Sequence, residues 1–392
     1  MIYLMTFGIS CLLFQLSESG YAKRKKSLKI ILVFLAICVP SLLAGLRDSS
    51  IGTDVELYGN SWFRFTRLFN LKEYLDFAQR CSVGVIYALL NYVVALFTDD
   101  VKIFYFILSF LETAMIYFGI KHINNSERYI WNDKIKIKKR GSEISLPFAM
   151  FCYYTIFYNN TLNLLRQSLA ITIVFLAYGF LVNRKYKTTI FLLILAVLSH
   201  SSAIFSFIIL PLYLISGKFK SKFNVLMFDL VIFSVTAIAM IVYKPILNFL
   251  VSHRILSSRF FTYMEETVVG GRMIRTVFWF LLAFFAYIAF YKMINFRSDN
   301  KFIISCISMS AAFSLITFMG NVFAIRMAFY FDVSAIAFIP MIPKIYKFKI
   351  GKDRNMKYLV YILLIILLIG RWYLDYVRSL NGQTYPYKFA QF

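Results

Sequence analysis

The sequence predicts an all-α, polytopic membrane protein: a helical bundle of about 11–12 membrane segments, including one or two broken or re-entrant ones. Of the 392 residues, 60% are hydrophobic, 19% are aromatic and only 16% are charged, whereas about a quarter of residues in soluble chains are charged. Apolar runs near the roughly 20 residues that cross a bilayer recur from end to end. We therefore expect a single integral membrane domain over residues 1–392.

The apolar runs place the individual segments. The first run, Met1 to Leu16, lacks a basic n-region, so it predicts a span rather than a cleavable signal. We expect spans near residues 1–17, 28–46, 83–98, 101–120, 146–159, 167–182, 188–216, 224–243, 276–294, 302–319, 322–342 and 357–374.

Lysine and arginine separate from one another along the chain. Lysine-rich connections, which mark the cytoplasmic side of a membrane protein, hold 21 Lys and 6 Arg; they are residues 23–29, 121–140, 184–187, 218–222, 292–301 and 344–357. Much of the net charge of +24 lies there, so membrane orientation explains it better than nucleic-acid binding. The rest of the chain holds 12 Arg and 4 Lys. Because the planar fork of arginine matches phosphate and carboxylate oxygens, this distribution predicts anion handling on the outer side.

Placing the lysine-rich connections inside fixes the expected topology. The N-terminus and the tail from about residue 372 then lie outside. The main outer loops are about 47–82 and 243–275, and a cytoplasmic loop covers about 121–145.

Two apolar runs do not fit a topology in which successive loops alternate between the outer and the cytoplasmic side. If 83–98 crossed fully, residues 121–140 with their seven basic side chains would lie outside, so we expect 83–98, or part of 47–82, to enter the membrane and return. The run 188–216 lies between two cytoplasmic clusters, and its halves are too short to cross at about 1.5 Å per residue. We expect a broken hairpin with its turn at 198–202, lining a central site.

Outer ends of spans carry the first two candidate groups. Residues 44–58, AGLRDSSIGTDVELY, follow the second span and bring together Arg47, Asp48, Asp54 and Tyr58. An ordinary capped turn is the alternative interpretation. Arg166, followed by Gln167, sits at a helix N-terminus. A cation gains nothing from the helix dipole there, which favours a bound anion; contact with lipid headgroups is the alternative.

Two further candidates lie within apolar sequence. His200 falls at the expected break, where a neutral imidazole could act as a general base or could be a satisfied structural residue. Arg326 lies about one turn inside its span, followed by Tyr330. Pairing of Arg326 with one of the intramembrane acids, Glu112 or Asp332, is the alternative to a substrate role.

The sequence lacks the motifs of several common enzyme classes. The chain has no P-loop, HExxH or GxSxG sequence, so we expect no nucleotide and no cofactor. The five cysteines lack CxxC spacing, and we expect no metal site.

Five sequence motifs follow one another over nearly the whole chain: GLRDSSIGTDVELY, NLLRQSLAI, LSHSSAIF, AIRMAFYF and a terminal PYKF. With these motifs in this order, the chain resembles the EpsG family, which is related in role to the Wzy-type polymerases of bacterial surface polysaccharide. The resemblance implies a multi-pass enzyme of the bacterial inner membrane. Such enzymes transfer a growing glycan from undecaprenyl pyrophosphate to the next lipid-linked repeat unit without a nucleotide, and related polymerases are thought to need no metal.

The resemblance also implies roles for the candidate residues. Arg47, Arg166 and Arg326 would hold the donor pyrophosphate, and His200 would accept a proton from the acceptor hydroxyl or position it. Substrate contacts would come from Asp48, Asp54, Tyr58, Gln167 and Tyr330. The expected partners are undecaprenyl-pyrophosphate-linked oligosaccharides, the bilayer and a chain-length regulator protein, with no nucleic acid. A flippase or exporter of the same lipid-linked unit, an acyltransferase, and a lipid-to-lipid glycan ligase remain alternatives.

Overall fold

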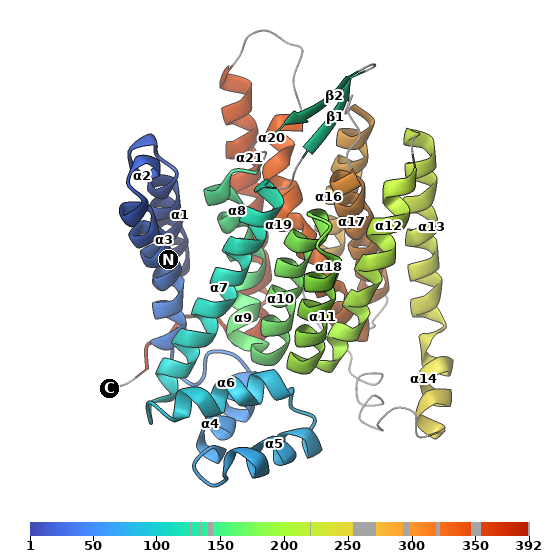
Figure 1. The fold of residues 1–392 in the computed structure, drawn as a ribbon. Helices are drawn as coiled ribbons and strands as arrows, with labels where there is room; N and C mark the ends of the chain where they lie inside the picture. The colour runs from blue at the N-terminus through green and yellow to red at the C-terminus, as the bar shows by residue number, and fades with distance from the viewer. Residues whose placement is uncertain are drawn as a thin grey trace. The chain divides into compact units, whose positions relative to one another are not determined.

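The fold is an all-α membrane bundle, as the sequence predicts. The computed structural model describes residues 1–125, 128–132, 135–139, 144–219, 221–253, 272–292, 298–318, 322–345 and 354–390. The described strands form one short antiparallel hairpin, β1 (Arg128–Asn132) and β2 (Ile135–Lys139), within the expected cytoplasmic loop (Figure 1). Seven helices of the described chain are long and apolar enough to cross a membrane, and five shorter apolar helices accompany them. The protein is therefore a multi-pass membrane protein.

The chain divides into two compact units. Unit 1 consists of Met1–Ser126, Gly141–Ile204 and Ile366–Phe392, and unit 2 consists of Glu127–Arg140 and Phe205–Ile365. The first boundary falls just after the expected break at 198–202, and the second lies within α21 (Arg354–Trp372).

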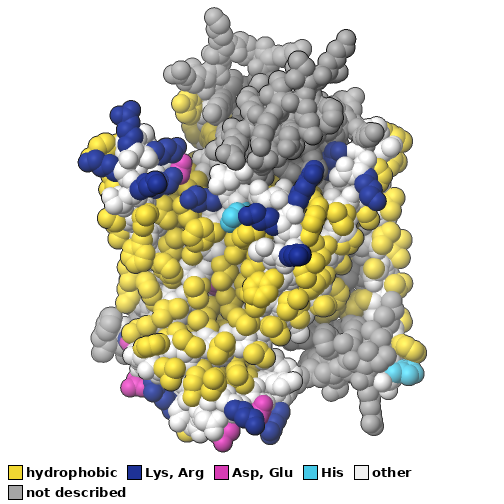
Figure 2. All heavy atoms as spheres, viewed as in Figure 1, with side chains coloured by type: hydrophobic (Ala, Val, Ile, Leu, Met, Phe, Trp, Pro, Cys, Tyr) yellow, Lys and Arg dark blue, Asp and Glu magenta, His cyan; other side chains and the backbone are white. Residues whose placement is uncertain are grey.

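Unit 1 is built around α7 (Val101–Asn125) and α10 (Leu165–Val182), which pack along one another. Helix α10 lies at the centre of the unit, because 83% of its 18 residues are buried, against 44% of the apolar 18-residue stretch of α3 (Lys26–Gly45). The remaining elements are α1 (Ile2–Ser17), α2 (Gly20–Arg24), α8 (Leu146–Tyr153), η2 (Tyr154–Tyr158), α9 (Asn159–Asn163), α11 (Tyr186–Ser199), the end of α21, η6 (Tyr373–Arg378) and η7 (Asn381–Gln383). Basic side chains gather over α2, whereas hydrophobic side chains cover α1 and α3 below it (Figure 2).

Short helices close one end of unit 1. They are η1 (Val55–Asn60), α4 (Ser61–Phe65), α5 (Leu71–Arg80) and α6 (Val85–Ala95). A capping box between Asn70 and Glu73 starts α5, and its apolar face stacks Phe77 on Trp62 with ring centres 5.3 Å apart. The 11 residues of α6 are about 16 Å long at 1.5 Å per residue, well short of the roughly 30 Å hydrocarbon core. The run 83–98 therefore does not cross fully.

The second expected irregularity is also present. Helix α11 ends at Ser199, and His200 has extended backbone angles (φ −156°, ψ 125°). The chain resumes as a 3-10 helix, η3 (Ser201–Ile208), and then as α12 (Ile209–Lys218). The predicted break at 198–202 is confirmed.

Unit 2 is built around α17 (Ser298–Phe318), of which 89% of residues 301–318 are buried. Its serines and alanines let neighbouring helices approach closely. The other elements are α12, α13 (Lys222–Ile241), α14 (Tyr243–Ser252), α16 (Arg272–Lys292), α18 (Val322–Asp332), α19 (Ser334–Phe338), η5 (Ile339–Met341), α20 (Ile342–Ile345) and the start of α21. Of the expected outer loop 243–275, residues 243–252 form α14, residues 272–275 begin α16, and 254–271 lie outside the described residues.

The turn before α6 leaves no room for a side chain at Gly84. A Cβ there would lie 1.9 Å from the carbonyl oxygen of Ser199. We expect Gly84→Ala to push α6 away from α11 and to lower the stability by about 1–3 kcal/mol or more. The measurement is the thermal midpoint of the purified protein in detergent. Gly370→Ala is the matched control, because no atom lies within 4 Å of its added Cβ. Equal midpoints for the two variants would contradict this contact.

Candidate functional site

Arg47 is buried just after the end of α3. Its exposed fraction is 3%; Nη1 donates to the carbonyl of Leu162 over 2.8 Å, and the guanidinium carbon lies 4.4 Å from the centre of the Tyr105 ring. Within the described chain, Arg47 forms no ion pair and its buried Nε has no acceptor. A buried guanidinium with unused donors is a suitable ligand for an anion that enters its surroundings.

The turn after Arg47 is held against the junction between α9 and α10. The side-chain oxygen of Asn163 accepts hydrogen bonds from the amide of Thr53 (2.7 Å), its hydroxyl (2.8 Å) and the amide of Asp54 (3.3 Å). Gly52 has a φ of +99°, and a Cβ there would lie 2.7 Å from the carbonyl oxygen of Leu162. Both features bring residues 52–54 onto the α9–α10 junction, where Leu164 is non-helical (φ −87°, ψ 50°).

Asp48 belongs to a local turn. Its carboxylate accepts from the Ser50 amide over 2.9 Å and the Ser50 hydroxyl over 2.7 Å. Hydrogen bonds from the Ser50 side chain and backbone hold the pKa of the exposed Asp48 carboxyl below its usual range. At Asp48 the geometry is thus that of a capped turn.

The C-terminal tail forms the other side of this region. Arg47 pairs with Phe389 in an antiparallel bridge, flanked by hydrogen bonds from the Asp48 amide to the Lys388 carbonyl and from the Ala390 amide to the Leu46 carbonyl, both 2.9 Å. Deeper in, the amide nitrogen of Asn159 donates to the Thr384 hydroxyl over 2.9 Å. The tail motif therefore supports the Arg47 turn.

Arg166 occupies the first turn of α10. Its guanidinium carbon lies 3.4 Å from the centre of the Tyr58 ring, and Nη1 donates to the Ser82 carbonyl over 3.3 Å. The buried Nε has no hydrogen-bond acceptor in the described part of the chain, and no side chain caps α10. The Tyr87 hydroxyl fixes the Tyr58 backbone through a 2.7 Å hydrogen bond to its carbonyl. The contact with Tyr58 holds the guanidinium in place at the start of α10.

His200 follows Ser199, the residue that packs against the turn at 82–84, and this turn also contacts Arg166. Its Nδ1 is 2.8 Å from the Ser202 hydroxyl, and the Ser202 amide donates to Nδ1 over 3.3 Å. Residues 82–84 link the two sites, because Ser82 accepts from Arg166 and Gly84 packs on Ser199. Ser82 has a φ of +55°, a strained conformation for a residue other than glycine.

Three other predicted residues lie elsewhere. Gln167 in unit 1 is buried in α10. In unit 2, Arg326 is half-buried on α18 and Tyr330 is fully buried one turn later. The structure thus brings Arg47, Asp54, Tyr58, Arg166 and His200 into linked contacts within unit 1, while Arg326 and Tyr330 belong to unit 2.

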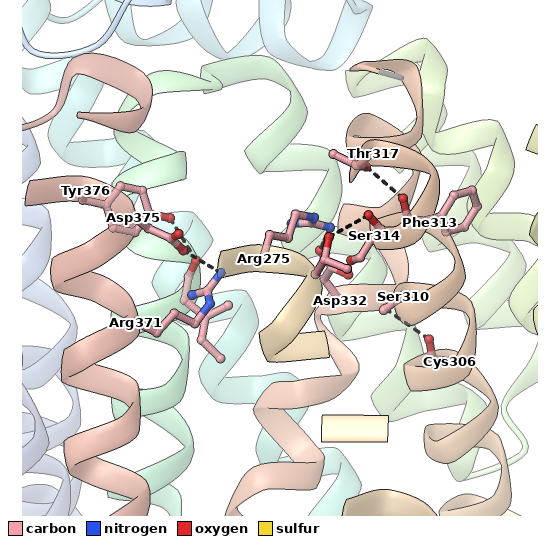
Figure 3. Close-up of polar contacts among 12 residues, drawn as sticks. Arg275, Cys306, Ser310, Phe313, Ser314, Thr317, Asp332, Arg371, Asp375 and Tyr376 are labelled. Atoms are coloured by element: carbon pink, nitrogen blue, oxygen red, sulfur yellow. Dashed lines mark hydrogen bonds and ion pairs between the residues drawn. The ribbon is translucent and has the colours of Figure 1, made fainter. Parts of the chain in front are cut away.

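The two intramembrane acids have described partners of their own. Asp332 forms an ion pair with Arg275 of α16, beside Ser314 (Figure 3), and Glu112 bonds to the Ser168 hydroxyl. In unit 1, Arg371 and Asp375 form a second buried pair at 3.1 Å. The sequence did not lead us to predict either ion pair. The pair of Arg371 and Asp375 could have been predicted, because residues four apart on a helix lie next to each other.

The donor set favours anions. Two arginine forks and an uncapped helix start supply hydrogen-bond donors. The described residues contain no group of three or more His, Cys, Asp or Glu side chains that could hold a metal ion.

Comparisons with known proteins agree with this architecture. The family model described as EpsG family matches residues 30–389. The search of curated proteins and the search of solved structures found no match. The matched region covers nearly the whole chain, including both arginine turns, the break at His200 and the tail. The chain belongs to the EpsG family, whose members are multi-pass membrane proteins associated with polysaccharide polymerisation.

Proposed function

We propose that this protein is a polysaccharide polymerase of the bacterial inner membrane. It transfers a growing glycan from undecaprenyl pyrophosphate to a lipid-linked oligosaccharide on the outer face of that membrane. The observation that carries the proposal is Arg166: its fork is stacked on Tyr58 at the uncapped start of α10, with Nε lacking an acceptor among the described residues. Two adjacent phosphates match a donor set of this kind.

The reaction breaks one bond and forms one. The acceptor hydroxyl oxygen attacks the anomeric carbon of the donor sugar, and the bond from that carbon to the pyrophosphate oxygen breaks. The pyrophosphate leaves with the bonding electrons, so negative charge grows on its oxygens. Arg47 and Arg166 of unit 1 are assigned to stabilise that charge, and a substrate role for Arg326 of unit 2 stays a prediction. Tyr58 holds the Arg166 fork, whereas Asp54 and Gln167 are assigned to the sugars. Asp48 shapes the outer turn.

His200 is assigned the proton of the acceptor hydroxyl. When Nδ1–H donates to the Ser202 hydroxyl at 2.8 Å, Nε2 keeps its lone pair and can accept that proton. The Ser202 amide favours the opposite tautomer, but at 3.3 Å it is the weaker contact.

Transport and ligation are the rival functions. A flippase of lipid-linked units also needs arginines that face pyrophosphate, so these residues do not separate the classes. Purified protein in vesicles, supplied with synthetic undecaprenyl-pyrophosphate repeat units, separates them. We expect a ladder of polymer. A single addition to another lipid would identify a ligase, and no product would favour a transporter; either result overturns the proposal. A dependence of ladder length on a second protein would identify a chain-length regulator.

Arg166→Lys is expected to abolish long polymer in this assay. Lysine retains the charge but loses both the planar fork and the stacking on Tyr58, and loss of a transition-state contact of this kind costs about 100-fold or more in rate. The matched control is Arg80→Lys, on the exposed end of α5, which should give a normal ladder. If Arg166→Lys and His200→Ala both made normal long chains at normal protein levels, this mechanism would be excluded.

Tyr58 gives a graded test of the stacking. Tyr58→Phe keeps the ring under Arg166 and should retain most activity. Tyr58→Leu removes the ring, and the loss of about 0.5–2 kcal/mol of cation–π interaction should slow polymerisation several-fold. The measurement is the initial rate of ladder formation at matched protein levels. Equal rates for the two variants would show that the ring does not position the fork.

A further inference from the structure

Glu112 is a buried acid that the proposed mechanism does not use. It lies in α7 with an exposed fraction of 1%, and its one described hydrogen-bond contact is the Ser168 hydroxyl of α10, at 2.5 Å. Arg47 and the hydroxyl of Tyr153 interact with it electrostatically, but no described cation forms an ion pair with it. An ionised carboxylate in such surroundings would be poorly compensated.

The Ser168 hydroxyl has one hydrogen, but two oxygen atoms that could accept it lie within reach, one of Glu112 and one of Leu165. Its oxygen also lies 3.2 Å from the Leu165 carbonyl. If Glu112 were ionised, the single hydroxyl hydrogen of Ser168 would be shared between the carboxylate and that carbonyl. If Glu112 is protonated, the acid donates to Ser168, and Ser168 donates to Leu165. In the protonated form the acid proton and the serine hydrogen therefore each have an acceptor of their own.

Unit 2 contains the same arrangement on unrelated helices. Asp229 of α13 is fully buried and forms no described ion pair. Its contact is the hydroxyl of Ser305 on α17, which also faces the Lys301 carbonyl at 3.0 Å. The Lys301 ammonium donates elsewhere, to the Phe219 carbonyl. None of the described arginines interacts with Asp229 as Arg47 does with Glu112, so Asp229 serves as an internal comparison.

We propose that Glu112 is a neutral carboxylic acid that donates its proton to Ser168, and that Arg47 consequently keeps an uncompensated positive charge for an anionic ligand. Glu112 is a positioning residue: it touches no substrate and supports the α7–α10 packing beside Arg47 without neutralising it. The protonation state stands on the geometry alone. The identity of the anion, a pyrophosphate, rests on the proposed function.

Infrared spectroscopy of the full-length protein in lipid vesicles tests the protonation state directly. At neutral pH, Glu112→Gln should remove a carboxylic acid C=O band, and ¹³C-labelled glutamate should shift the same band. Asp229→Asn, the matched control, should leave that band in place. Loss of carboxylate bands in Glu112→Gln, with the acid bands unchanged, would overturn the proposal.

Ser168→Ala covers the case in which Glu112→Gln does not fold. Removing the hydroxyl deprives the acid of its acceptor, so the glutamic acid C=O band should shift in frequency. A glutamic acid region identical to that of the wild type would show that no acid donates to Ser168, and would also overturn the proposal.

Binding of inorganic pyrophosphate tests the consequence for Arg47. Replacing a neutral acid by a neutral amide should leave the dissociation constant within about threefold, whereas removing a nearby negative charge should tighten binding about tenfold or more. Arg47→Gln should weaken binding about tenfold or more. Tightening by Glu112→Gln would contradict the proposal. If the wild type bound no pyrophosphate, the proposed donor site would fail, and the infrared result alone would decide the state of Glu112.

Discussion

A guanidinium inside a membrane protein needs acceptors for its donors, and among the described residues Arg47 of unit 1 donates to a backbone carbonyl, that of Leu162. That carbonyl lies at the end of α9, where the helix is interrupted before α10. A single hydrogen bond thus connects the end of the second predicted span with the start of the central helix. The turn at 52–54 and the tail at 388–390 complete the same region.

The geometry of α10 then determines what this end of unit 1 can bind. Its first turn carries both Arg166 and Ser168, and Ser168 is the hydrogen-bond partner of Glu112. The turn at 82–84 contacts Arg166 on one side and the end of α11 on the other. Donors for an anion and the imidazole of His200 therefore depend on one short turn, whereas Arg326 is held by a separate framework of α16, α17 and α18.

Much of this fold follows from local sequence properties. The length of an apolar run is a property of one segment, and it predicts a membrane helix there. The distribution of lysines revealed two segments that do not cross the membrane in the ordinary way, α6 and the region around His200. Long-range contacts were not accessible in the same way. Asn163 stood within a recognised motif, but its role depends on a turn about 110 residues earlier. The tail gave no chemical signal, because its contacts with the Arg47 turn at residues 388–390 are backbone hydrogen bonds. The β1–β2 hairpin was also missed, although Ile135 and Ile137 alternate with lysines at the two-residue period of a strand.

The bridge between Arg47 and Phe389 has a consequence for biosynthesis. The two strands of the bridge are separated by almost the entire chain, so the Arg47 turn cannot reach its final arrangement while the chain is still being inserted into the membrane. Helices such as α1, α3 and α7 can pair earlier, because their contacts are close in sequence. The arginine that holds the α9–α10 junction acquires its complete surroundings only after residues 383–390 have emerged. In an unfinished chain, the helices of unit 1 can therefore pack before the surroundings of Arg47 are complete.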